Sequence, residues 1–193
     1  MKIGGPRFFH RSILLVAACI LAVVLTACTG RGGGQLPPQT VFTGSASFGF
    51  TFSCENGDLK IELSYNDKGS NPLGSSFGIH GIVDTIDSVT ESAICIDHNP
   101  PPGGNELIFL GRYYLTSSAP SLFPSTCPKS ETSTAPLCRF EVIVQDNDKS
   151  ETPSQGDSFA IKLSGSTTFG SQLPGPVVYA RAGTLSSGNL TVD

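Results

Sequence analysis

The chain has 193 residues, of which 22 are glycine and 14 are proline, and it lacks tryptophan. The formal net charge is −4, but the first 27 residues hold three of the 12 basic residues and no acidic ones, which leaves a net charge of −7 on the rest. This composition is typical of short strands joined by turns rather than of helices. An acidic domain repels phosphate backbones, which argues against nucleic acid as a partner.

The N-terminal segment has the layout of an export signal. Residues 1–11 are short and basic, and residues 12–27 (SILLVAACILAVVLTA) are nearly all apolar. A helix that spans a bilayer needs about 20 apolar residues, so this stretch is short for a permanent anchor and suits the apolar core of a signal peptide. The sequence therefore predicts a cleaved signal peptide over residues 1–27.

The segment ends in Leu25-Thr26-Ala27-Cys28, which resembles the lipobox of bacterial lipoproteins. In that family the cysteine thiol carries diacylglycerol, a palmitate-type anchor, and the chain is cleaved on its amino side. The resemblance implies lipid attachment at Cys28 and an extracytoplasmic domain held at the cell membrane or outer membrane. The next residue is Thr29 rather than the Asp that commonly retains lipoproteins in an inner membrane. The alternatives to a lipoprotein signal are an ordinary signal peptide followed by a chance cysteine and an uncleaved membrane anchor.

Residues 28–40 are rich in glycine and proline (TGRGGGQLPPQT follows Cys28). Glycine-rich chain is flexible and Pro-Pro is stiff and extended. The sequence predicts a tether over residues 28–40, which would lift a β-domain of residues 41–193 off the membrane.

In the β-domain the apolar residues recur with period two. Alternation over residues 48–54, the dipeptide Asn56-Gly57 and alternation over residues 59–65 predict a β-hairpin. Further strands are expected at Ser76–Asp84, Ser88–Asp97, Glu106–Ser117, Arg139–Asp146, Ser158–Ser164, Val177–Gly183 and Asn189–Val192. The expected fold class is all-β: an antiparallel β-sandwich or partly closed barrel of about nine strands, after an N-terminal signal helix and a flexible linker.

Four cysteines remain in the β-domain: Cys54, Cys95, Cys127 and Cys138. An even number in an exported domain predicts disulfides, and three connectivities are open. We favour Cys127–Cys138, which would staple the long Ser117–Leu137 loop, and this leaves Cys54–Cys95. Cysteine and histidine spacing does not fit a zinc site.

The segment Gly74-Ser75-Ser76-Phe77-Gly78 matches the G-x-S-x-G pattern of serine esterases. That motif needs a strand before the serine and a helix after it, whereas here a turn precedes and a strand pattern follows. His80 would lie on the same strand, and His98 would lie in a solvated loop. We therefore predict no catalytic residue and keep a hydrolase using Ser76 as an alternative.

An acidic segment begins at Asp146-Asn147-Asp148 and is closed by Asp157. Alternating oxygen donors are typical of calcium loops, and Asp146, Asp148 and Asp157 are the ligands that this segment offers. The glycine and glutamate that such loops require are absent. The alternative is a solvated hairpin turn. Calcium is the one cofactor that the sequence suggests, and we expect that the protein requires none.

Several segments together are similar to a small β-domain often found near the C-termini of secreted bacterial surface proteins. They are Phe48–Thr51, Leu63–Asp67, Ile79–Asp84, Phe140–Asp148, Gly156–Leu163 and Ala182–Leu190. The resemblance implies the fold and the surface location, and it transfers no catalytic residue.

The sequence thus predicts a non-enzymatic, lipid-anchored surface module that binds an unidentified envelope or extracellular ligand or serves as an accessory module. A serine hydrolase acting through Ser76 and a calcium-stabilised adhesive module are the alternatives.

Overall fold

The computed structural model describes residues 28–55, 58–82, 105–127, 138–147, 156–165 and 176–192. The predicted signal peptide and the predicted strand Ser88–Asp97 lie outside these residues. The described part of the chain holds strands and no helix. The strands are β1 (Cys28–Leu36), β2 (Ala46–Glu55), β3 (Asp58–Asp67), β4 (Phe77–Ile82), β5 (Glu106–Leu115), β6 (Cys138–Gln145), β7 (Ser158–Ser164), β8 (Val177–Thr184) and β9 (Ser187–Val192).

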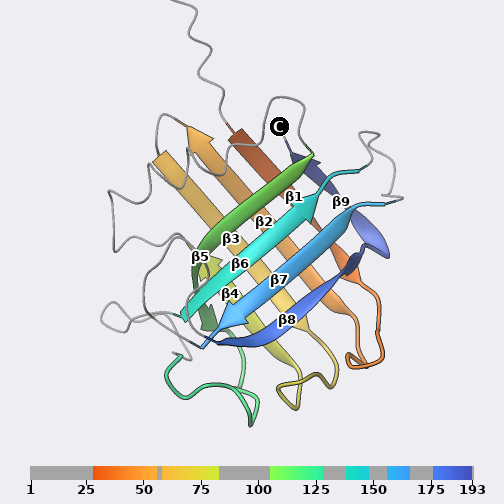
Figure 1. Ribbon diagram of the computed structural model, residues 1–193, viewed down its shortest axis with the longest axis vertical. Coiled ribbons are helices and arrows are strands. Elements are labelled where there is room, and N and C mark those ends of the chain that lie inside the picture. The colour runs from red at the N-terminus through yellow and green to blue at the C-terminus, as the bar shows by residue number, and fades with distance from the viewer. Residues whose placement is uncertain are drawn as a thin grey trace, which may run out of the picture.

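These strands form one antiparallel sheet in the order β8-β7-β6-β5-β4-β3-β2-β1-β9. Strands β1 to β8 are neighbours in chain order, and β9 returns to pair with β1. The sheet curls over itself, so that β5 to β8 lie across β1 to β4 and β9 and the strands of the two layers cross steeply (Figure 1). The predicted all-β fold of about nine strands is confirmed, in the form of a half-barrel.

Aromatic side chains hold the two layers together. Phe48 of β2 stacks on Phe159 of β7 with ring centroids 3.7 Å apart, and Phe50 of β2 lies 5.4 Å from Phe109 of β5. All four rings are buried. They occupy the inward positions of strands with period two, so the alternation in the sequence directly specifies this core.

The hairpin predicted from residues 48–65 is confirmed for its two strands. β2 and β3 pair with Cys54 opposite Leu59 and Phe48 opposite Tyr65. The Asn56-Gly57 turn itself lies outside the described residues.

The tether predicted over residues 28–40 is wrong for residues 28–36. These residues form β1, an internal strand that pairs with β2 on one side and with β9 on the other. A Cβ atom on Gly32 would lie 2.6 Å from the backbone oxygen of Asn189, and one on Gly34 would lie 2.5 Å from that of Ser187. Glycine at these positions therefore serves close packing of β1 against β9 and is not a sign of flexibility.

The segment that follows β1 covers part of the edge strand β8. The side-chain amide of Gln39 donates a hydrogen bond of 2.7 Å to the backbone oxygen of Ala182 in β8. Gln39 and Phe42 also exchange two backbone hydrogen bonds, which fold this segment into a tight turn. The proline- and glycine-containing stretch after β1 is thus packed on the domain.

Candidate functional site

A groove of about 760 Å³ opens at the end of the sheet where β3 ends and β4 begins. Most of its lining is polar and hydroxyl-rich. The lining residues are Ser47, Asn66, Asp67, Lys68, Ser76, Phe77, Gly78, Ser117 and Ser118. The neighbouring strands β2, β3 and β4 and the segment after β5 supply them, so residues from four parts of the chain converge here.

Gly78 of β4 lines the groove and is itself buried. A Cβ atom at this position would lie 2.5 Å from Oδ1 of Asn66 and 2.6 Å from Oγ1 of Thr116. Its backbone N–H donates to the hydroxyl of Ser117 at 2.8 Å. The absence of a side chain at residue 78 therefore makes room for the polar groups of β3 and of the segment after β5.

Asp67, another lining residue, is buried, and both oxygens of its carboxylate are hydrogen-bonded. Oδ2 accepts hydrogen bonds from the Tyr179 hydroxyl at 2.7 Å and from the Arg181 guanidinium at 3.2 Å. Oδ1 accepts a hydrogen bond from the backbone N–H of Gly69 at 3.2 Å. The ion pair with Arg181 neutralises the buried carboxylate, so Asp67 contributes shape and order to the groove rather than free negative charge.

The Arg181 guanidinium joins this carboxylate to the turn between β1 and β2. It donates to the backbone oxygens of Pro37 and Gly44 at 2.8 and 2.9 Å, and it lies over the Phe42 ring at 4.7 Å. A planar group with several donors suits this set of partners, which a lysine could not satisfy.

Two buried tyrosines complete the network. The Tyr65 and Tyr179 hydroxyl oxygens lie 2.5 Å apart, and because Tyr179 donates to Asp67, Tyr65 donates to Tyr179. Burial raises the pKa of both hydroxyls well above the ordinary value for tyrosine. Both hydroxyls therefore stay protonated near neutral pH. The hydrogen bonds then run in one direction, from Tyr65 to Tyr179 to Asp67.

Lys68 follows Asp67 directly and is exposed at the groove. Because Asp67 is neutralised by Arg181, the ammonium of Lys68 is the charge that the lining presents to a ligand. The site therefore offers several hydroxyl groups, one side-chain amide and one cation. These groups can hydrogen-bond a polar ligand.

Ser76 lies in the groove, as an exposed residue at the end of a turn. Asn71 builds this turn: its side-chain amide donates to the backbone oxygen of Ser75, and its side-chain oxygen accepts from the N–H of Leu73. Gly74 has φ of +105°, which favours glycine. A strand follows Ser76 rather than a helix, so the strand–turn–helix context of an esterase serine is absent.

The structure does not bring His80 to Ser76. His80 lies on β4 on the outer face of the sheet, and its ring centroid is 5.3 Å from that of Tyr114. No histidine in the described ranges is hydrogen-bonded to Ser76. His98 lies outside the described residues.

Two of the three predicted calcium ligands contact the edge strand β9. Asp157 is buried and accepts hydrogen bonds from the N–H groups of Asn147 at 3.0 Å and Leu190 at 3.2 Å. Asp146 accepts from the N–H of Val192 at 3.3 Å. Asp148 lies outside the described residues, and the described ones contain no group of three or more metal-ligating side chains. The two carboxylates thus cap the backbone of β9, and calcium stays a prediction.

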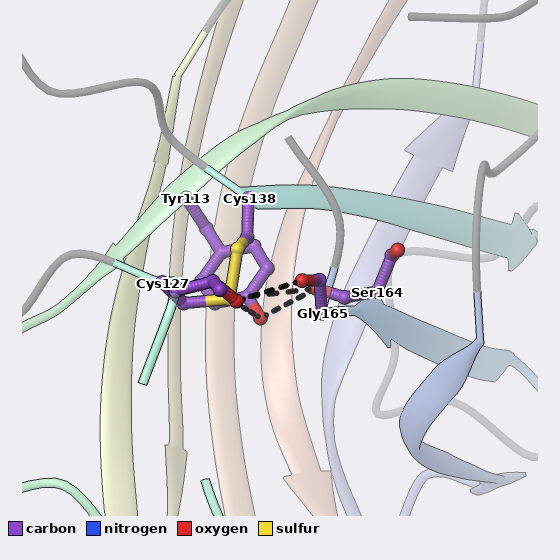
Figure 2. Close-up of a disulfide and its surroundings, with 6 residues drawn as sticks. Tyr113, Cys127, Cys138, Ser164 and Gly165 are labelled. Carbon is purple, nitrogen blue, oxygen red and sulfur yellow. Dashed lines mark hydrogen bonds between the residues drawn. A yellow bond between two sulfur atoms is a disulfide. The ribbon is translucent and has the colours of Figure 1, made fainter. Parts of the chain in front are cut away.

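The predicted disulfide between Cys127 and Cys138 is confirmed (Figure 2). It ties the segment after β5 to the first residue of β6. The Tyr113 hydroxyl lies beside it and donates to the backbone oxygen of Ser164 at 2.9 Å. This links the disulfide region to the end of β7.

Cys54 is also disulfide-bonded. Cys95, its predicted partner, lies outside the described residues. The register of β1 and β2 places Cys28 directly opposite Cys54. The pairing of Cys54 with Cys95 therefore stays a prediction.

No protein-family description, no curated protein and no solved structure matches this chain. Among the described residues there is no helix of the length and apolar character needed to cross a membrane. The resemblances to bacterial lipoproteins and to a bacterial surface domain therefore stay predictions.

The buried network behind the groove was not anticipated from the sequence. Asp67 continues the inward period of Leu63 and Tyr65 on β3, and Arg181 follows Tyr179 at the next inward position of β8. The sequence does carry a signal for this network. An acidic residue and a basic residue stand at inward positions of two strands, and buried charges occur in pairs.

Proposed function

We propose that this protein is a lipid-anchored, extracytoplasmic module without catalytic activity, and that it binds a hydroxyl-rich envelope ligand in the groove beside Asn66. The groove is the observation that carries this proposal. Serine hydroxyls, the Asn66 amide and the Lys68 ammonium offer both donors and acceptors in an open depression. Such a site suits recognition of a polar surface component, whereas a catalytic site needs a nucleophile with a base in reach.

The anchor is supported by the basic start, the apolar segment and the Leu25-Thr26-Ala27-Cys28 end. Intact mass and peptide mapping of the protein purified from membranes of its own host test it. We expect a chain that begins at Cys28 and carries the mass of the lipid. An unmodified chain that still begins at Met1 would contradict the proposed anchor.

Ligand binding is tested with soluble glycan fragments released from the envelope of the same host. Isothermal titration with the wild-type protein should give saturable binding. Asn66→Ala removes the side-chain amide from the groove and should abolish or strongly weaken it. Ser64→Ala is the matched control, because Ser64 is exposed two residues earlier on β3 and does not line the groove. Equal loss in both variants, or no binding at all, would contradict this ligand class.

The runner-up is an envelope serine hydrolase, which the exposed position of Ser76 in the groove favours. Its test is hydrolysis of short-chain nitrophenyl esters by the wild type and by Ser76→Ala. Activity that disappears with Ser76→Ala would support the hydrolase. Absent activity, or activity that survives the substitution, would eliminate it.

A further inference from the structure

We infer that the domain stands on the membrane with the Cys28 end of its sheet against the bilayer and the groove pointing away from it. This orientation rests on the proposed lipid attachment at Cys28. It identifies a membrane-facing end of the domain and gives the ligand site access to the outside.

β1 begins at Cys28 and is an internal strand of the sheet. Cys28 is the first residue of β1, and pairing begins at Cys28 itself, opposite Cys54. From Gly30 onward β1 is paired on both sides, because Val192 of β9 lies opposite Gly30. A lipid on Cys28 would thus be joined to the rigid sheet almost without a spacer, and the end of the sheet must approach the bilayer wherever the acyl chains insert.

The groove lies at the opposite end of β1 from Cys28. β1 runs over nine residues from Cys28 to Leu36, and Leu36 lies opposite Ala46, the neighbour of the groove residue Ser47. A strand of this length spans roughly 27 Å. The start of β1 and the end of β9 lie at one end of the molecule (Figure 1), and the groove lies at the other end of β1 and β2.

Strand β3 supplies a matched pair of reporter positions. Lys60 pairs with Ser53, which is itself opposite Thr29, so Lys60 lies at the Cys28 end. Lys68 follows the last residue of β3 and lines the groove. Both lysines are exposed, and about 27 Å of extended chain separates them. Replacing either one removes a single positive charge, so the two variants differ chiefly in position.

The experiment uses the full chain, expressed and processed in its own host, with Lys60→Cys or Lys68→Cys labelled by a maleimide fluorophore. The parent protein, treated in the same way, reports labelling at native cysteines. Each purified lipoprotein is placed in phosphatidylethanolamine–phosphatidylglycerol vesicles that contain a lipid with a nitroxide on its headgroup. Vesicles without the nitroxide lipid provide the unquenched reference.

We expect the fluorophore at position 60 to lose most of its emission and the one at position 68 to keep it. If Lys60→Cys does not fold, Glu62→Cys, which is exposed two residues further along β3, replaces it. Equal quenching at both positions on a protein with lipidated Cys28 would mean that the domain lies flat or tumbles, which overturns the orientation alone. Quenching at position 68 only would invert the orientation. A protein without lipid on Cys28 would overturn both the orientation and the proposed anchor.

Discussion

The Asp67 carboxylate and the Arg181 guanidinium form an ion pair at 3.2 Å in which neither side chain is exposed to solvent. The pair joins β3 to β8, strands that lie far apart in the order of the sheet. Arg181 also fixes the turn after β1 through the backbone oxygens of Pro37 and Gly44. One buried pair therefore ties the lining of the groove to the opposite layer and to the connection between β1 and β2.

Removing the cation from this pair should strongly destabilise the fold. Arg181→Met leaves the Asp67 carboxylate buried without its charge partner, and loss of one member of a buried pair costs about 3–5 kcal/mol. The free energy of unfolding from urea titration measures this effect. Lys162→Met is the control: it breaks the Lys162–Glu141 pair, in which the lysine side chain is 44% exposed. We expect a cost of about 0–1 kcal/mol there, and equal costs in the two variants would refute the structural role of Arg181.

The buried tyrosines predict a loss of stability in alkaline solution. Burial raises the pKa of Tyr65, Tyr113 and Tyr179 in the native state. In the unfolded chain tyrosine loses its proton near pH 10, so above this pH the native state binds more protons than the unfolded state. The free energy of unfolding should then fall with rising pH, by up to about 1.4 kcal/mol per pH unit for each tyrosine.

Urea titrations between about pH 9 and about pH 11 measure this slope. Tyr113→Phe removes one of the three buried hydroxyls and should make the decline shallower by up to about 1.4 kcal/mol per pH unit. A slope that does not change in this variant would show that Tyr113 ionises equally in both states.

The glycines of β1 and β2 predict opposite responses to the same substitution. Gly32→Ala places a methyl group 2.6 Å from the backbone oxygen of Asn189, and overpacking of this kind costs about 1–3 kcal/mol. At Gly49 the nearest heavy atom to an added Cβ is 3.9 Å away, so Gly49→Ala should be neutral or stabilise slightly. Thermal melting of the two variants measures the difference, and similar melting temperatures would argue against tight packing of β1 on β9.

The proposed lipidation of Cys28 excludes a disulfide at the same sulfur atom. Its backbone lies opposite disulfide-bonded Cys54, yet a thiol that carries diacylglycerol cannot form a disulfide. The proposed anchor therefore predicts that non-reducing peptide maps of the mature protein join Cys54 to Cys95. A peptide that joins Cys28 to Cys54 would instead show an unlipidated domain, and Cys95 would then react with maleimide.

The strand positions could be read from the sequence because their inward residues recur with period two, as at Phe48 and Phe50. β1 could not, because its inward positions at Gly30, Gly32 and Gly34 carry no side chain and leave no apolar period. The groove could not be predicted from the sequence either. The groove depends on the missing side chain at Gly78 and on the register between neighbouring strands, and neither follows from local composition.

The carboxylates that cap β9 also limit contacts between copies of this domain. A lipid anchor concentrates its carrier in two dimensions, where an uncovered strand edge would readily pair with that of a neighbouring copy. Asp157 and Asp146 occupy the N–H groups of Leu190 and Val192, and Gln39 occupies the backbone oxygen of Ala182 on the other edge strand. The two edges of this sheet are thus partly closed to intermolecular pairing, which under the proposed anchor would keep copies separate at high density on a membrane.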